Sequence, residues 1–219
     1  MIIYDISKSR FLVLAIFLVM LSFIISWIYY IIRFYFGFEY AMGIYPAINI
    51  FDLDEENTIP AWLGSSLLLI AGLLSFLISK QDVFDNKKHW LGICILLVFL
   101  SLDEASMVHE RKEILAIFIV VIAFFISGGI GYFRFISRIN RRVAYYLVFA
   151  AIFFASGSIF IDSINSPYIQ EHGRDNIAYR GLATLEEGLE FTGIFLFLQG
   201  LIQQLSVINR HRVTSDVFR

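Results

Sequence analysis

Residues 11–32 read FLVLAIFLVMLSFIISWIYYII, an apolar stretch of 22 residues without a charge. Because an α-helix rises about 1.5 Å per residue, this stretch can cross the roughly 30 Å of hydrocarbon in a bilayer. It is longer than the roughly 7–15 residues of a signal-peptide core, and no small-residue cleavage site follows it closely, so we expect it to remain attached. Trp27, Tyr29 and Tyr30 near its end suit the aromatic belt of a membrane surface.

The composition of the whole chain is also typical of a membrane protein. Of its 219 residues, 58% are hydrophobic and 16% are charged, whereas soluble domains carry roughly 45–50% apolar and about 25% charged residues. In hydrocarbon, backbone polar groups must bond within their own segment, so only helices or closed barrels can cross. The apolar blocks are far longer than the ~10 residues of a barrel strand. We therefore predict an all-α, polytopic membrane protein.

Six apolar blocks, separated by short polar segments, predict a single six-helix transmembrane domain over residues 1–219. The expected spans are 11–32, 61–79, 90–109, 114–135, 143–161 and 184–205, with a polar loop over 162–180 before the last. Trp62 and Trp90 near the starts of the second and third spans are interpreted as interface anchors.

The distribution of charge predicts the orientation of these spans. With the N-terminus placed inside, 12 of the 17 Lys and Arg residues lie inside and 15 of the 19 acidic residues lie outside. Because cytoplasmic loops carry an excess of Lys and Arg, we expect both ends of the chain in the cytoplasm and the protein in the cell (inner) membrane.

Two spans can cross only if they include charged residues. The third apolar run, 90–102, has 13 residues, or about 20 Å of helix, and the sixth is similarly short and interrupted by glutamines. Each helix must therefore continue into its acidic end. The residues drawn in are Asp103, Glu104, His109 and Glu110 in the third span and Glu186, Glu187 and Glu190 in the sixth.

Helical phase gives these residues a direction. At about 100° per residue, the three glutamates of the sixth span fall within an arc of about 100° that Ala183 and Ile194 share. An ionised carboxylate costs roughly 2.5–3.5 kcal/mol at mid-membrane, and like charges raise each other's pKa. We therefore expect the arc to face protein rather than lipid, with protonation, salt bridges to Arg111, Arg174 or Arg180, or a bound cation relieving the charge.

The bound cation is our leading hypothesis, as a divalent metal site near the extracytoplasmic surface. Its predicted ligands are Asp103, His109, Glu110, Glu186, Glu190 and Asp162. Oxygen ligands suit Ca²⁺, Mg²⁺ or Mn²⁺, and the imidazole of His109 extends the range to Zn²⁺ or Fe²⁺, so the identity of the metal stays open.

Three functions fit such a site, and whether the protein is an enzyme stays open. A metal-activated water could hydrolyse a lipid-like substrate, with Glu104 or Glu187 as the general base. Alternatively, the carboxylates could serve a proton- or cation-coupled transporter or channel. The third possibility is a non-catalytic sensor or assembly partner. The expected partners are the lipid bilayer and a lipid or small-molecule ligand, and no basic patch typical of nucleic-acid binding is present.

Three acidic blocks carry a resemblance to known sequences. Residues 51–62 (FDLDEENTIPAW), 102–110 (LDEASMVHE) and 185–190 (LEEGLE) resemble recurring blocks of an uncharacterised family of bacterial multi-pass inner-membrane proteins, from about residue 51 to 200. The resemblance implies that the blocks belong together and brings no activity. A looser similarity is to membrane hydrolases of the alkaline ceramidase type, but this chain has fewer outer histidines and six predicted spans rather than seven.

The first of these blocks has an alternative interpretation. Its acidic run, 52–56, is similar to the start of an EF-hand loop. It has Asn57 where that loop needs glycine and Leu63 where it needs glutamate. We therefore interpret the run as a solvated loop on the side of the predicted cluster.

Overall fold

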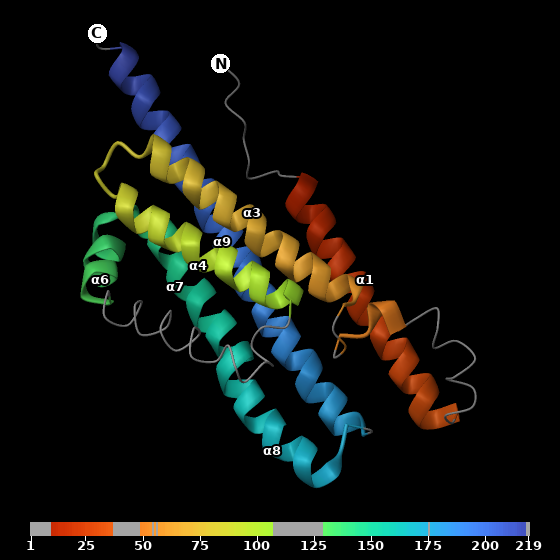
Figure 1. The fold of residues 1–219 in the computed structure, drawn as a ribbon. Helices are drawn as coiled ribbons and strands as arrows, with labels where there is room; N and C mark the ends of the chain where they lie inside the picture. The colour runs from red at the N-terminus through yellow and green to blue at the C-terminus, as the bar shows by residue number, and fades with distance from the viewer. Residues whose placement is uncertain are drawn as a thin grey trace. The chain divides into compact units, whose positions relative to one another are not determined.

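The computed structural model describes residues 10–36, 49–53, 55, 57–106, 129–174 and 176–217. Every regular element in these ranges is helical, which confirms the all-α prediction for this part of the chain (Figure 1). The elements are α1 (Arg10–Ile31), the π-helical η2 (Ile32–Phe36), the 3₁₀ turn η3 (Asn49–Phe51), α3 (Ile59–Gln81), α4 (Lys87–Ser106), α6 (Gly129–Arg138), α7 (Arg141–Ala155), the π-helical η5 (Ser156–Ile161), α8 (Asp162–His172) and α9 (Ile177–Val217).

Asparagines mark the starts of three helices. The backbone oxygen of Asn86 accepts hydrogen bonds from the first turn of α4, and Asn140 and Asn176 do the same for α7 and α9. The side chains of Asn140 and Asn176 also accept backbone N–H groups, at 3.0 and 2.8 Å. Such caps satisfy donors that have no partner inside the helix and stabilise it by roughly 1 kcal/mol.

Five helical stretches are long and apolar enough to cross a membrane. They are Arg10–Phe36, Ile59–Gln81, Lys87–Ser106, Arg141–His172 and Ile177–Thr214. They cover the first, second, fifth and sixth predicted spans and the third as far as Ser106, after which its last three residues lie outside the described residues. Most of the fourth predicted span, 114–135, lies outside the described residues, and its described part belongs to the short helix α6.

The helices α4 and α9 include the acidic residues that a helix needs to span the bilayer thickness. Helix α4 continues past Leu102 and includes Asp103 and Glu104. Helix α9 begins at Ile177, so all three glutamates of the sixth span are helical. It has 41 residues, or about 60 Å of helix, and is much longer than the predicted span.

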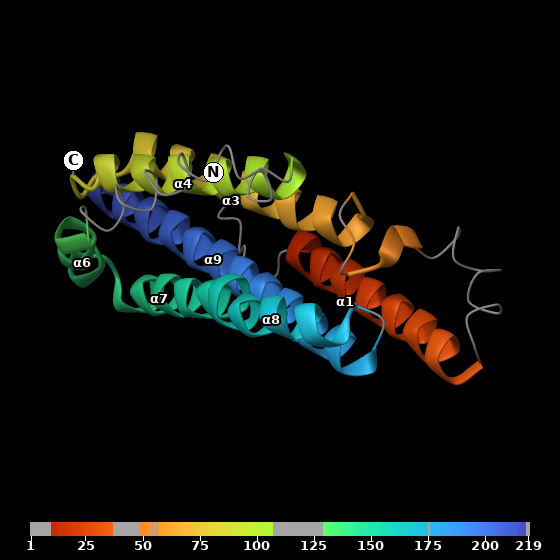
Figure 2. The ribbon, with the colours of Figure 1, turned by 60° about the horizontal axis from the view of Figure 1, so that its bottom comes forward.

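The prediction of a loop over 162–180 is wrong for residues 162–172, because the chain stays helical from α7 through η5 into α8. Helix α8 lies beside the first part of α9 in both views (Figures 1 and 2), and two buried side chains, the last of η5 and one of α8, explain its stability. Ile161 and Asn165, one turn apart, are 6% and 5% exposed. The burial of these two side chains against neighbouring protein therefore stabilises the helix although the segment is rich in polar residues. The helix ends at Gly173, whose φ of 74° suits glycine.

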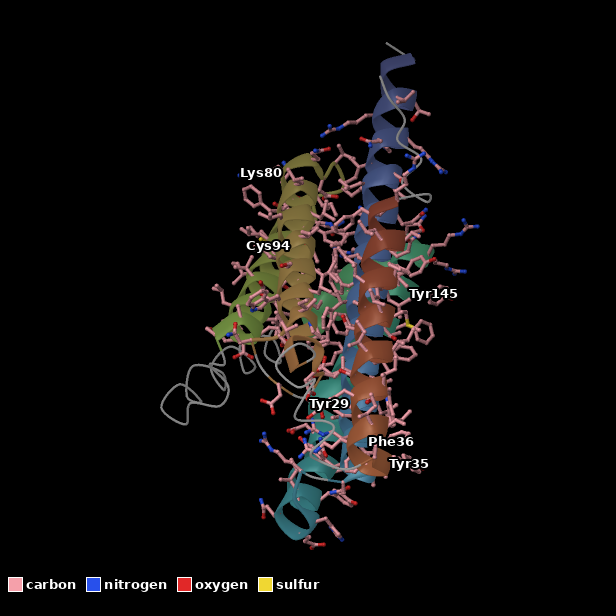
Figure 3. All side chains as sticks on the ribbon, turned by 90° about the vertical axis from the view of Figure 1, so that its right-hand side faces the viewer. Tyr29, Tyr35, Phe36, Lys80, Cys94 and Tyr145 are labelled. Carbon is pink, nitrogen blue, oxygen red and sulfur yellow. The ribbon has the colours of Figure 1, made fainter. Side chains whose placement is uncertain are left out.

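The described residues belong to two compact units. The first contains the described parts of Ser65–Phe149 and Leu196–Arg219, and the second contains those of Ser9–Gly64 and Ala150–Phe195. In the first unit α3 and α4 run side by side in Figures 1 and 2, and Figure 3 labels Lys80 and Cys94 on them. The candidate site residues whose contacts are described below belong to the second unit.

Candidate functional site

The acidic loop is anchored in the second unit through Asp52. Its side chain is 2% exposed and accepts hydrogen bonds from the Tyr30 hydroxyl and, at 3.4 Å, from Nη1 of Arg180. The neighbouring backbone oxygen of Phe51 accepts a hydrogen bond from Ser26 of α1. The interpretation of this run as a solvated loop is therefore wrong at Asp52. Its carboxylate can be buried because it forms an ion pair with a buried cation.

That cation is Arg180, in the first turn of α9. Its guanidinium lies over the rings of Tyr30 and Tyr179, at 4.8 and 5.5 Å from their centroids. Its Nη1 also donates to the Tyr30 hydroxyl at 3.4 Å. Arg180 was one of three predicted salt-bridge partners for the carboxylates of the third and sixth spans, whereas the ion pair found in the structure joins it to Asp52 of the loop.

The aromatic residues at the end of α1 face protein rather than lipid. Tyr29 and Tyr30 are 2% and 1% exposed, so their assignment to an aromatic belt is wrong. Their hydroxyl groups have polar partners inside the protein: Tyr30 donates to Asp52, and Tyr29 accepts from Arg33 at 3.5 Å. Figure 3 labels Tyr29 near the end of α1 and Tyr35 and Phe36 beyond it.

The three glutamates of α9 face the interior of the second unit, as predicted. Glu186, Glu187 and Glu190 are half-buried. Ala183 and Ile194, which share their arc, are each 5% exposed. An interior position separates the carboxylates from lipid but gathers negative charge in a poorly solvated place.

The π-helical segment η5 approaches these glutamates closely at Gly157. A Cβ atom on Gly157 would lie 2.7 Å from the backbone oxygen of Glu186 and 2.7 Å from Cγ of Glu190. Any larger residue would push the two helices apart. Single π-helical turns inside α-helices are rare and occur frequently at functional sites.

Asn165 contributes the unexpected polar group of this region. Its Nδ2 donates to Oε2 of Glu186 at 3.3 Å. The residue is 5% exposed, and its Oδ1 is buried with no hydrogen-bond donor among the described residues. A buried acceptor without a partner costs roughly 1–3 kcal/mol. Sequence reasoning missed Asn165, although Gly157, Ile161 and Asn165 are spaced by four and would have indicated one helical face if the fifth span had been extended.

The other predicted site residues have different outcomes. His109 and Glu110 lie outside the described residues. Asp103 and Glu104 are half-buried on α4 in the first unit, and their association with the α9 carboxylates stays a prediction. The side chain of Asp162 is exposed at the start of α8.

Within the second unit, the structure brings Asn165 into contact with Glu186, and Glu190 lies one helical turn further along α9. Among the described residues, no group of three or more His, Cys, Asp or Glu side chains is placed to hold a metal ion. A cation bound by the described residues would thus need the amide oxygen of Asn165 and backbone or water oxygens beside the carboxylates, which are ligands typical of hard cations.

Comparison with known proteins gives one match. The family described as a domain of unknown function (DUF8692) matches residues 9–204. Neither the curated proteins nor the solved structures contain a match to the chain. Because the matched segment covers most of the sequence, this chain belongs to the DUF8692 family.

Proposed function

We propose that this protein is an integral membrane protein that binds a divalent cation in its second unit, at Glu186, Glu190 and Asn165. The observation that carries the proposal is the buried Oδ1 of Asn165, which has no donor in the described part of the chain although its own amide group contacts Glu186. A cation would satisfy this oxygen and the carboxylate together. The same hydrogen bond shows that the Nδ2 side of the amide group is directed at Glu186.

The direction of helical side chains supports a shared site. Side chains on a helix lean toward its N-terminus, so the carboxylates of Glu186 and Glu190 extend along α9 toward its beginning. Residues four apart on one helix have Cβ atoms roughly 5–6 Å apart. The carboxylate of Glu186 accepts a hydrogen bond from Asn165, and the same geometry predicts that the carboxylate of Glu190 extends toward Glu186.

The balance of buried charge favours a doubly charged ligand. Among the described residues of the second unit, the buried or half-buried charged side chains are those of Arg33, Asp52, Arg180, Glu186, Glu187 and Glu190. Four are acidic and two are basic, so their formal net charge is −2 when all are ionised. A divalent cation would neutralise this charge without requiring protonation of any carboxylate.

The complete topology is part of the same proposal. We infer six spans in a bacterial inner membrane, with both chain ends in the cytoplasm, from the excess of Lys and Arg on one side. The beginning of α9 and the end of α8 would then lie near the extracytoplasmic surface. The cation site would be open to that side.

Titration of the metal-free protein tests the site. Protein purified in detergent is treated with a chelator and titrated with MnCl₂ or CaCl₂ while its unfolding free energy is measured. A ligand at 100 times its Kd stabilises a protein by about 2.7 kcal/mol. We expect this stabilisation in the wild type, its loss in Glu186→Gln, and its retention in Glu171→Gln, which changes an exposed acid of α8.

The variant Asn165→Asp separates a cation ligand from a structural hydrogen bond. If Asn165 supplies a ligand oxygen, Asp at this position should lower stability without metal, through repulsion of Glu186, and increase the stabilisation by Mn²⁺. If Asn165 only donates to Glu186, the variant should be destabilised equally with and without Mn²⁺. The latter result, or the absence of any metal effect in the wild type, would refute the proposal.

A bound cation could serve either of two activities at this location. It could activate water toward a lipid-like substrate, with Glu187 beside Glu186 as the general base. It could alternatively be the transported ion, for which the π-helical turn η5 opposite the glutamates would be a natural point of movement. Uptake of the cation into proteoliposomes distinguishes transport from hydrolysis.

A further inference from the structure

The short helix α6 of the first unit is fixed to the start of α4 by aromatic contacts. Phe135 is 1% exposed, and its ring stacks on His89 with centroids 5.0 Å apart and an interplanar angle of 7°. The same ring meets the edge of Trp90 at 5.1 Å. Trp90 is 0% exposed, so its predicted role as a membrane-interface anchor is wrong. It supports α6 instead.

A second contact explains how closely α6 approaches α4. The Tyr132 hydroxyl occupies the space where a Cβ atom on Gly92 would lie, and it donates to the backbone oxygen of His89 at 3.5 Å. Only glycine at position 92 leaves room for this arrangement. The position of α6 is therefore set by a specific fit between Tyr132 and Gly92.

Basic side chains lie on α6 and at the starts of α4 and α7, which are close to α6 in Figures 1 and 2. They are Lys87 and Lys88 at the start of α4, Arg134 and Arg138 on α6, and Arg141 and Arg142 at the start of α7, and all six are exposed. We call these six residues the basic face. The turn before α4 contributes two acids, of which Asp85 is exposed and Asp82 is buried, and Asp82 accepts the backbone N–H of Asn86. A clear excess of positive charge remains.

An exposed aromatic residue lies on α6, next in sequence to a member of the basic face. Phe133 is 78% exposed although it directly precedes Arg134. Guanidinium groups bind phosphate oxygens through two parallel hydrogen bonds, and an apolar side chain beside them can enter the boundary between lipid headgroups and acyl chains. A soluble polyanion offers no partner to Phe133. The combination therefore favours a lipid over nucleic acid or a free anion.

We propose that the basic face binds the headgroup of an anionic phospholipid, with Phe133 in contact with its acyl region. The inference is independent of the cation site, because it uses only residues of the first unit. It also agrees with the predicted orientation, since cytoplasmic leaflets carry anionic lipids. The aromatic contacts of Phe135 hold α6, which carries two of the arginines, against the start of α4, which carries the two lysines.

Lipid titration in mixed micelles tests this site. The purified protein is titrated with phosphatidylglycerol or phosphatidylcholine, and bound lipid is counted by native mass spectrometry. Each basic residue near an anionic surface contributes about 1 kcal/mol, which corresponds to about fivefold in affinity. We expect Arg134→Gln/Arg138→Gln to weaken phosphatidylglycerol binding about 25-fold and to leave phosphatidylcholine binding unchanged.

Two further variants give the experiment its controls. Arg10→Gln/Arg174→Gln removes two exposed arginines of the second unit and should leave phosphatidylglycerol binding unchanged. Gly92→Val keeps every charge but displaces Tyr132, so it should weaken binding by moving α6. The proposal is overturned if the α6 double variant binds like the wild type, if the control pair loses as much affinity, or if equimolar inorganic phosphate abolishes lipid binding.

Discussion

The ion pair between Asp52 and Arg180 predicts a large effect for the substitution Asp52→Asn. The two side chains are 2% and 6% exposed, and Oδ1 and Nη1 lie 3.4 Å apart. Asparagine preserves the size of the side chain and can still accept the hydrogen bond from Tyr30. The substitution therefore removes the negative charge and little else, leaving a buried guanidinium without its counter-charge.

The magnitude follows from the distance and the burial. At an effective dielectric constant of about 20, unit charges 3.4 Å apart attract each other by about 5 kcal/mol. Part of this offsets the desolvation of the two groups, and removal of one partner from a buried pair typically costs about 3–5 kcal/mol. Because the introduced amide would keep the Tyr30 hydrogen bond, we expect Asp52→Asn to lower the unfolding free energy by about 3 kcal/mol.

A double-mutant cycle measures this interaction. Unfolding by SDS in mixed micelles is followed by tryptophan fluorescence. Trp27 reports on this region because its ring centroid lies 6.0 Å from that of Tyr30. Combining Asp52→Asn with Arg180→Gln should cost less than the sum of the single variants by about 2 kcal/mol or more. Glu55→Gln, an exposed acid in the same loop, is the matched control. An effect of Asp52→Asn no larger than that of the control, or no coupling with Arg180, would refute the reasoning.

Two further predictions concern the contact between α3 and α4 and the length of α9. Ser65 and Ser101 each donate a hydrogen bond to the other's backbone oxygen at 2.8 Å. We therefore expect Ser101→Ala to lower the unfolding free energy by roughly 0.6–1.7 kcal/mol. In the same SDS titration, Ser66→Ala, which changes an exposed serine, should have no effect. The 41 residues of α9 span about 60 Å, twice the hydrocarbon thickness. A cysteine at Thr214 in a Cys94→Ser background should therefore react with an impermeant maleimide in inverted vesicles, and reaction in intact cells instead would reverse the proposed orientation.

The long apolar helices of the fold were predictable because the bilayer supplies a fixed length. A run of 13 apolar residues cannot cross it, so the extension of α4 through Asp103 followed from arithmetic. The interior direction of the α9 glutamates followed in the same way, since lipid cannot accept them. Both predictions used only the length of one helix and the energetic cost of charge in lipid, and neither required knowledge of the residues that the helix packs against.

The anchoring of Asp52 could not be found in this way. Its partners lie 22 and 128 residues away in the sequence, on α1 and α9. An acidic loop that carries one buried carboxylate has the same local composition as one that is fully solvated. The pairing depends on how Tyr30 and Arg180 meet in the folded chain, and no periodic pattern encodes that meeting.

The missed helix α8 shows a different limit. Polar residues after Ile161 indicated a loop because a membrane span was expected to end there. A helix that leaves the hydrocarbon can continue if it packs on protein, and burial of Asn165 against α9 provides that support. The four-residue spacing from Gly157 was the available signal, although it could not by itself indicate a neighbour.

The chemical identity of residue 165 bears directly on the proposed cation site. With Asn165, the buried and half-buried charges of the described second unit sum to −2, which one divalent cation can balance. A carboxylate at this position would provide the same type of oxygen but leave an excess negative charge in a poorly solvated interior. An amide supplies a ligand oxygen without adding charge. Its buried Oδ1, which no described donor reaches, is thus the group expected where a site needs one more oxygen and no further charge.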